Sequence, residues 1–534
     1  MSGPLDISPF RHGTVRGSED PRRSRSFEGR FGRMFRNLPP AEISSPAASD
    51  AQPLAAGKQR SAPDDVLSEE GALDALKMLA AGMTTRADEA VSGEAVRVDV
   101  MAAAAERDSG IPAGYTYLGQ FIDHDLTFDP VSTLQRDNDP EALVNYRTPR
   151  FDLDCVYGRG PDDQPYLYQR DGVRMLLGDP LGEPRPDGNL PKDRDVPRNA
   201  EGRAIIGDPR NDENVIIAQL HALLLRFHNR MADELGAHKR RDFPEVQRLV
   251  RWHYQWVVIH DFLRRVVNET TYYEVLPHLK KKKPDLLKDP PKLLFYEPRR
   301  EAFLPVEFSA AYRFGHSMVR SEYQLNESRA RSVAGPFKIL GLDRTGRPDL
   351  ENSLIGFRRF RLDWAIDWGL FFEGISEDKQ AQRAKRIDTT LSEPLNNLPF
   401  EFTKDRPSLA ARNLIRGWRQ RLPSGQAVAA AMGVTPISDG NKLFGLGHPA
   451  GISAAFKGNT PLWYYVLAEA DRICDGQHLG PVGGRIVMET FVGLLLQDGH
   501  SFLNRDPLWT PSKTFLNEKG KFWMPELVKA AIHA

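Results

Sequence analysis

Apolar residues recur at helical spacing in several long stretches of this chain. In residues 214–235, five apolar side chains fall on one stripe of a helix: Ile216, Leu220, Leu223, Phe227 and Met231. Residues 246–267, 308–323 and 483–498 carry similar amphipathic patterns, whereas the alternating runs typical of strands are short and scattered. The pattern predicts a mostly α-helical fold from about residue 67 onward.

The first 66 residues lack this periodicity. They are rich in Pro, Ser, Arg and Ala, a composition typical of irregular segments. We therefore expect an irregular N-terminal arm over residues 1–66, anchored by the stretch "FEGRFGRMFRNLPP", and one large helical domain over residues 67–534.

Charge and cysteine content exclude several classes of protein. The 72 Lys+Arg balance the 72 Asp+Glu, which disfavours a dedicated nucleic-acid-binding protein. The two cysteines, Cys155 and Cys474, allow one bridge at most. No apolar run reaches the roughly 18 residues of a membrane span, and the first residues lack the apolar stretch of a secretory signal. The default expectation is a cytoplasmic protein, with export by another route as the alternative.

Residues 117–130, "YLGQFIDHDLTFDP", place several polar groups inside an apolar segment. In a helix over residues 114–128, Gln120, Asp123 and His124 stand at i, i+3 and i+4 on one face. Asp125 is rotated from that face by about 100°. From the spacing alone, a core histidine satisfied by an aspartate and a buried functional site are equally good interpretations.

The motif "GQFIDHDLTF" resembles the distal-helix signature of the animal-type haem peroxidases, in the peroxidase–cyclooxygenase superfamily, with a bacterial-type member as the expected subgroup. The resemblance implies that Gln120 and His124 are catalytic, that Asp123 is linked to haem and that Asp125 binds calcium. Further motifs follow in the family's order over residues 117–413, and weaker similarity continues to about residue 505.

The motif "TPRFDLDCVYG" resembles the calcium loop of the same family. The resemblance implies Thr148, Arg150, Asp152 and Asp154 as ligands, with Arg150 acting through its carbonyl. Alternate residues of an extended chain point to one side, and oxygen ligands suit calcium. Without the resemblance, "FDLD" would be interpreted as a turn.

The segment "GDPRNDENVIIAQLHALLLRFHNRMADEL" resembles the family segment that carries the catalytic arginine. The resemblance implies Arg210 as that arginine and Glu213 as a second carboxylate that can form an ester with haem. The best-known family member has a methionine at the position of Asn214, so we expect no sulfonium link here. His221 and His228 are expected to be structural.

Two further motifs resemble the proximal side of the haem site. In "YRFGHSMV", the resemblance implies His316 as the iron ligand and Arg313 as a partner of a haem propionate. In "SLAARNLIRGWRQRLP", it implies Asn413 as the partner of His316, although the family's usual "RSRDHG" continuation reads "IRGWRQR" here.

The resemblance implies a haem peroxidase catalytic domain over residues 67–534 that binds haem b, which can be ester-linked, and calcium. The implied function is reduction of hydrogen peroxide to water through a ferryl haem, with oxidation of halide, thiocyanate or small organic donors.

Two alternatives remain: a fatty-acid dioxygenase of the same superfamily, and a catalytically silent interaction protein stabilised by haem or calcium. The dioxygenase needs a radical-forming tyrosine, but "LDWAIDWGLFFEG" has Trp364 and Trp368 and no tyrosine. The presence of both His124 and Arg210 favours an active enzyme over the silent protein.

Overall fold

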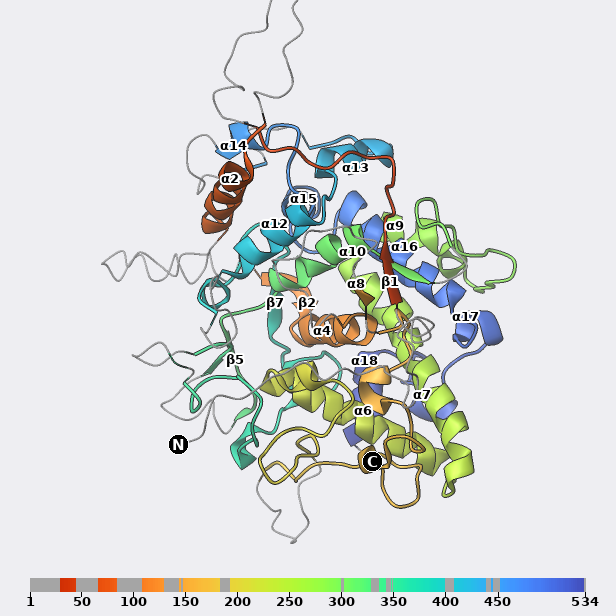
Figure 1. Cartoon of the computed structure of the whole chain (residues 1–534). Helices are drawn as coiled ribbons and strands as arrows, with labels where there is room; N and C mark the ends of the chain where they lie inside the picture. Colours follow the sequence, from red (N-terminus) through yellow and green to blue (C-terminus); the bar gives the residue numbers. More distant parts are fainter. Residues whose placement is uncertain are drawn as a thin grey trace, which may run out of the picture.

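Helices account for most of the regular structure in the computed structural model (Figure 1). The structure describes residues 29–44, 66–83, 108–128, 144–145, 147–182, 193–298, 302–327, 336–341, 347, 349–398, 408–437, 443–444 and 452–532. The α-helices are α2 (Glu69–Ala81), α4 (Gly114–Leu126), α5 (Asp154–Tyr157), α6 (Val215–Glu234), α7 (Phe243–Val257), α8 (Arg264–Val266), α9 (Glu269–Val275), α10 (Val306–Ala311), α12 (Leu409–Arg419), α13 (Gly425–Ala431), α14 (Ile452–Ala455), α15 (Leu462–Cys474), α16 (Pro481–Gln497), α17 (Phe502–Arg505) and α18 (Met524–Ile532).

Within the part of the chain that the structure describes, short 3₁₀ turns and one π-helix connect these helices. The 3₁₀ turns are η4 (Pro165–Leu167), η5 (Pro209–Asp212), η6 (Arg240–Asp242), η8 (Pro277–Lys280), η9 (Tyr312–His316), η10 (Leu362–Trp364), η11 (Trp368–Leu370), η12 (Glu393–Asn396) and η14 (Lys513–Phe515). The π-helix is η7 (Val258–Leu263).

The strands of the described residues are short and form three small sheets. They are β1 (Gly29–Gly32), β2 (Asp108–Pro112), β3 (Val144–Asn145), β4 (Phe303–Pro305), β5 (Glu322–Tyr323), β6 (Phe337–Lys338) and β7 (Arg383–Lys385). Strand β1 lies between antiparallel β3 and parallel β4, while β2 pairs with β7 and β5 with β6, both antiparallel. The expected mostly α-helical fold is confirmed.

Helix α4 lies in the middle of the molecule, with α6 beside it (Figure 1). It also contacts η5 on one side and η9 on another, so it lies between two short turns that come from distant parts of the chain. Its first residue is Gly114, where a Cβ would lie 2.4 Å from the ring of Phe372. Glycine therefore lets the start of α4 pack directly against the segment around Phe372.

Helix α6 is buried on nearly every side, although the sequence pattern predicts one apolar stripe. Most of its polar side chains are buried as well and find partners, as the cost of burying an unpaired polar group requires. Gln219 donates to the Trp364 carbonyl at 2.7 Å and accepts from the Ile366 amide at 3.0 Å. His228 contacts the Tyr157 hydroxyl at 3.0 Å. Helix α6 is thus a central helix of the core rather than a surface helix.

The predicted helix over residues 308–323 is shorter than expected. Helix α10 gives way to the 3₁₀ turn η9, which ends at His316. The Ser317 hydroxyl donates to the Phe314 carbonyl at 2.8 Å and so competes for a backbone group of the helix. The chain then turns away, which leaves His316 at the end of a turn rather than inside a helix.

The predicted helices over residues 246–267 and 483–498 are present. The first runs as α7, then as the π-helix η7, then as α8. Asp261 in η7 accepts hydrogen bonds from the Tyr115 hydroxyl at 2.6 Å and the Met524 amide at 2.8 Å, and so ties η7 to α4 and α18. The second is α16.

Residues 29–44 pack against the helical core and include most of the stretch "FEGRFGRMFRNLPP" expected to anchor the N-terminal arm. Phe31 and Phe35 are buried, and the amides of Met34 and Phe35 donate to the buried Glu307 carboxylate at 3.0 and 3.3 Å. The rest of the expected arm, residues 1–28 and 45–65, lies outside the described residues, so the domain boundary at residue 66 stays a prediction.

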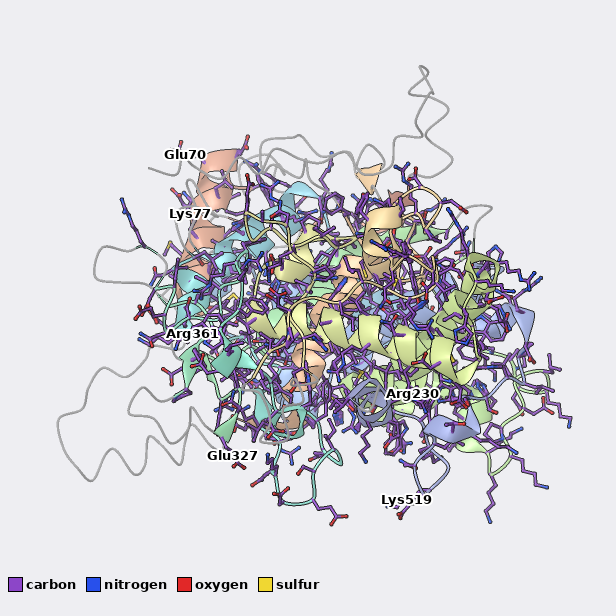
Figure 2. The ribbon with its side chains drawn as sticks, turned by 90° about the horizontal axis from the view of Figure 1, so that it is seen from below. Glu70, Lys77, Arg230, Glu327, Arg361 and Lys519 are labelled. Carbon is purple, nitrogen blue, oxygen red and sulfur yellow. The ribbon has the colours of Figure 1, made fainter. Side chains whose placement is uncertain are left out.

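Charged side chains such as Glu70, Lys77 and Lys519 point outward from the edge of the molecule (Figure 2). Cys155 and Cys474 are both free thiols. Within the described residues, no helix combines the length and the apolar character that crossing a membrane requires.

Glu307→Gln should destabilise the protein, because the new amide group would face a backbone N–H that now donates to the carboxylate. Leaving such a buried group unpaired costs about 1–3 kcal/mol. Chemical unfolding followed by tryptophan fluorescence measures the change. The exposed Glu518→Gln is the control and should shift the free energy of unfolding by less than about 0.5 kcal/mol. Equal stability of the two variants would contradict the anchoring role of Glu307.

Candidate active site

Two side-chain caps shape the turn that precedes α6. The Asp208 carboxylate accepts from the Arg210 amide at 2.9 Å and so begins η5, with Pro209 at the first position of the turn. Asn214 then caps α6 by accepting from the Ile216 and Ile217 amides at 3.0 and 2.9 Å. The two caps fix the short segment between them, which carries Arg210, Asn211 and Glu213, against α4.

His124 on α4 is buried beside this segment. Its Nδ1 lies 2.7 Å from Asn211 Oδ1, and its Nε2 lies 3.8 Å from Glu213 Oε1. Burial and the nearby Arg210 lower the pKa of His124 to about 4, so the imidazole is neutral at neutral pH. An amide oxygen only accepts hydrogen bonds, so Nδ1 carries the proton and Nε2 has a free lone pair. His124 can thus act as a proton acceptor.

Arg210 is tied to the backbone of α4 and to a buried carboxylate. Its Nη2 donates to the His124 carbonyl at 3.0 Å, to the Thr127 carbonyl and to Asp208 at 2.8 Å. Its guanidinium also lies 5.0 Å from the centre of the Phe128 ring. Among the described residues no acceptor engages Nη1, and the side chain keeps 27% of its surface accessible. The arrangement leaves one end of the guanidinium free to meet a ligand.

Gln120 and Glu213 contact each other across the interface between α4 and η5. Gln120 Nε2 donates to Glu213 Oε1, and Asn214 Nδ2 donates to Gln120 Oε1 at 3.4 Å. Burial raises the pKa of Glu213 to about 7, although its side chain keeps 38% of its surface accessible. Asp123 is half-buried on the same face of α4, and its charge acts on the pKa of His124. The fold therefore brings together four polar residues expected at this part of the site: Gln120, Asp123, His124 and Glu213.

A second histidine–asparagine pair lies where η9 meets α12. Asn413 Nδ2 lies 2.8 Å from His316 Nδ1. Burial and the adjacent Arg313 lower the pKa of His316 to about 3, so this imidazole is neutral too. Rotation of the Asn413 amide presents its oxygen to an Nδ1–H, which frees Nε2 for a metal. Apart from its chain neighbours, no atom of the described residues lies within 4 Å of a Cβ built at Gly315, so open space adjoins the residue before His316.

Three arginines gather near His316, two of which the sequence analysis missed. Burial and the charge of Arg416 lower the pKa of Arg313 to about 10, with a further contribution from Arg412. Asp123 opposes this shift, which places its carboxylate within electrostatic reach of the group. Arg412 and Arg416 stand at i and i+4 on α12, on either side of Asn413 in "ARNLIR". Such a cluster suits a ligand that carries carboxylates.

Three carboxylates meet on the other side of α4. The ligand atoms of Asp125, Asp152 and Asp154 all lie within 4.8 Å of one another. Asp125 is completely buried; its Oδ2 accepts from the Leu153 amide at 3.3 Å, and its Oδ1 has no hydrogen-bond partner among the described residues. Burial raises the pKa of all three groups, to about 7 for Asp154. An unpartnered buried oxygen inside an acidic cluster fits a hard cation.

The loop that carries these carboxylates is not the extended chain that the sequence suggested. Leu153 adopts a left-handed conformation at φ 56°, and α5 begins at the next residue. The Arg150 amide donates to the Thr148 carbonyl at 2.8 Å, which also bends the chain. The bend, rather than alternation, brings Asp152 and Asp154 to Asp125. Ligation by the Thr148 hydroxyl and the Arg150 carbonyl stays a prediction.

Arg147 links the acidic cluster to the segment of Arg210. Its guanidinium donates to Asp154 and, at 2.6 Å, to Asp208. Asp208 has no accessible surface, and although burial opposes its ionisation, Arg210 and Arg147 hold its pKa well below the usual range. A continuous row of paired charges therefore runs from the acidic cluster to Arg210.

The chain is similar to two curated proteins over part of their length. Chorion peroxidase of Drosophila melanogaster is 24% identical over 302 residues, which are 54% of this chain and 33% of that protein. Probable oxidoreductase PXDNL of Homo sapiens is 27% identical over 197 residues, which are 34% of this chain and 12% of that protein. The similarity thus spans a third or less of these relatives.

Solved structures share the fold. Peroxidase A from Dictyostelium discoideum superposes with a TM-score of 0.54 at 16% identity and covers 95% of this chain and 93% of its own. Fatty acid alpha-dioxygenase from Oryza sativa superposes with a TM-score of 0.52 at 16% identity and covers 95% and 86%. At this level of identity the likeness concerns the fold alone.

The family model for animal haem peroxidases matches residues 134–492, which is more than half of the chain. The matched region contains the loop of the acidic cluster, the segment of Arg210, His316 and Asn413, whereas α4 with His124 precedes it. The chain therefore belongs to the animal haem peroxidase family.

Proposed function

We propose that this protein is a haem-dependent peroxidase that reduces hydrogen peroxide with electrons from a small reducing substrate. The observation that carries the proposal is the pair of neutral histidines, each in contact with an asparagine at Nδ1. His124 meets Asn211 at 2.7 Å and His316 meets Asn413 at 2.8 Å. Helix α4 contacts the segments of both pairs, η5 and η9. One histidine suits a proton acceptor and the other an axial metal ligand.

The residues around His316 fit a haem group. A neutral imidazole with its second nitrogen fixed is the usual protein ligand of haem iron. Open space lies at Gly315, the residue before this ligand, and Arg313, Arg412 and Arg416 supply the positive charge that two propionates need. Haem bound here would supply the redox chemistry, in which one peroxide and two electrons with two protons yield two waters.

The chain's own residues move the proton and stabilise charge. His124 Nε2 takes a proton from one peroxide oxygen and returns it to the other, which leaves as water. Arg210, through its Nη1, which is unengaged among the described residues, would offset the negative charge that develops on the leaving peroxide oxygen as the O–O bond breaks. Gln120 holds Glu213 through a hydrogen bond, which keeps the carboxylate from pairing with His124 at 3.8 Å.

The reducing substrate would be a halide, thiocyanate or a small organic donor. A fatty-acid dioxygenase remains the second candidate, because Oryza sativa and Arabidopsis thaliana fatty acid alpha-dioxygenases share the fold at TM-scores of 0.52. The dioxygenase needs a tyrosine that can form a radical, and the aromatic segment around Trp364 contains none. Trp364 itself is buried against Phe337 and Phe360. Oxygen uptake with a fatty acid, measured beside oxidation of a chromogenic donor by peroxide, separates the two activities.

His124→Gln should keep haem but react with peroxide about 10²–10⁴-fold more slowly in stopped-flow measurements, because the proton acceptor is lost. In the wild type the rate should fall as the pH drops through about 4, since only neutral His124 accepts a proton and its pKa is lowered to about 4 from 6.5. Arg210→Ala should also be slow, whereas His316→Ala should lose haem. A His124→Gln protein that reacts at the wild-type rate would contradict the role of His124.

Asp152→Ala should release a bound calcium ion and lower both haem retention and the melting temperature. A cation held by Asp125, Asp152 and Asp154 would fix α4 relative to the loop, and a ligand at 100 times its Kd stabilises the native state by about 2.7 kcal/mol. Metal analysis and melting curves with and without a chelator measure the effect. The exposed Asp163→Ala in the following loop is the control. Calcium-free protein that melts unchanged would refute the site.

Repeated exposure to peroxide should attach haem covalently to Asp123 and Glu213 through ester bonds. In each, a carboxyl oxygen would bond to a haem methyl carbon, a C–H bond of that methyl would break, and one peroxide would act as the two-electron oxidant and leave as two waters. Glu213 is held beside His124, and an ester removes a carboxylate charge whose burial is costly. Asn214 caps α6 and has no sulfur, so no sulfonium link forms. Acid extraction and mass analysis of haem-bearing peptides test this, with Asp123→Asn and Glu213→Gln each removing one link. If all haem stays extractable after the peroxide cycles, the linkage is absent.

A further inference from the structure

Asn211 joins two buried histidines that come from different helices. Its Oδ1 lies 2.7 Å from His124 Nδ1 on α4, and its Nδ2 lies 3.1 Å from His221 Nδ1 on α6. Asn211 and His221 have no accessible surface, and His124 keeps 6%. The row His124–Asn211–His221 is therefore closed to solvent, and each polar contact within it decides where a proton lies.

The amide assigns one tautomer to each ring. Oδ1 only accepts and Nδ2 only donates, so His124 carries its proton on Nδ1 while His221 Nδ1 accepts. Burial lowers the pKa of His221 to about 3, so this ring is neutral and its proton lies on Nε2. A flipped amide would reverse both tautomers and put a proton on His124 Nε2, the atom that must accept one from peroxide. The orientation of one buried amide thus decides whether His124 can act as a base.

We infer that Asn211 is a positioning residue that holds His124 as the Nδ1–H tautomer, and that His221 holds the Asn211 amide in the orientation this requires. The inference rests on the proposed role of His124 as the proton acceptor. It assigns His221 a function in the site, although the sequence analysis interpreted this residue as structural.

Other charged groups also act on His124. Arg210 lowers its pKa, Asp208 and Asp123 raise it, and Glu213 Oε1 lies 3.8 Å from Nε2. None of these groups is changed by a substitution at Asn211. A change in the nitrogen-15 signals of His124 that follows such a substitution therefore reports the contact at Nδ1.

Asn211→Asp and Asn211→Leu separate positioning from packing. The aspartate keeps an acceptor at Nδ1, so the nitrogen-15 spectrum of His124 should still show a protonated Nδ1 and an unprotonated Nε2. The leucine has a similar volume but no acceptor, so peroxide reduction should slow about 10–100-fold, part of the roughly 10²–10⁴-fold that a general base supplies.

Asn229→Leu is the matched control. Asn229 is a similarly buried amide on α6 that holds the Met175 backbone, with bonds of 2.7 and 3.0 Å, away from His124. It should lower the melting temperature without changing the nitrogen-15 signals of His124. If Asn211→Leu leaves these signals where Asn229→Leu does, Asn211 only packs and the inference fails.

Nitrogen-15 spectra of histidine-labelled protein test the tautomer without any turnover. In the wild type loaded with diamagnetic zinc protoporphyrin, the His124 signal, assigned by its loss in His124→Gln, should show a protonated Nδ1 and an unprotonated Nε2. His221→Phe should mix the two tautomers. A protonated Nε2 in the wild type overturns the inference, whereas a His124→Gln protein with the wild-type peroxide rate overturns the proposed function instead. The spectra carry the test even if Asn211→Leu fails to fold.

Discussion

The site depends on one completely buried carboxylate, Asp208, and the two arginines that neutralise it. A buried charge without a partner is strongly destabilising, so Arg147 and Arg210 must both remain in contact with Asp208. Asp208 also caps η5, which fixes the backbone that carries Arg210. Arg147 in turn reaches Asp154 in the acidic cluster. Removal of the Asp208 carboxylate would therefore release both Arg210 and the loop that carries Asp154.

Burial lowers the pKa of both histidines. Exclusion from water is the largest cause of the lowered pKa of His124 and of His316, and both rings stay neutral where an exposed imidazole would begin to gain a proton. Each ring also contacts an asparagine at Nδ1: the amide oxygen of Asn211 lies at His124, and the amide nitrogen of Asn413 lies at His316. Burial in the protein keeps the imidazole rings neutral, whereas the contact with a single amide decides which ring nitrogen carries the proton.

Helix α4 connects the two halves of the arrangement through adjacent residues. His124 faces Asn211, while Asp125 points to the acidic cluster, because successive helical residues are about 100° apart. The carbonyl of His124 also accepts from Arg210. A displacement of the loop at the acidic cluster would therefore reach His124 through one peptide unit and Arg210 through one hydrogen bond. This coupling explains how a structural cation could influence a proton acceptor that it does not touch.

Local pattern was sufficient for α6, α7 and α16, because their period of apolar residues reflects burial along a continuous segment. It was also sufficient for the shared face of Gln120, Asp123 and His124, which follows from helical geometry alone. The bend at Leu153 and the early end of α10 escaped the pattern, since single backbone contacts cause them.

Tertiary structure alone decided which distant groups meet. Asn211 lies 87 residues from His124, and Arg147 lies 61 residues from Asp208, so neither contact leaves a periodic signal in the sequence. In the sequence, Arg412 and Arg416 resemble residues on the exposed face of a helix. Only the packing of α12 beside His316 brings them to the site. The sequence by itself predicted the helices and the candidate residues of the site, because both predictions depend on neighbours along the chain. The protonation and the partners of these residues were decided by packing, because both depend on which charges and amides the fold brings together away from water.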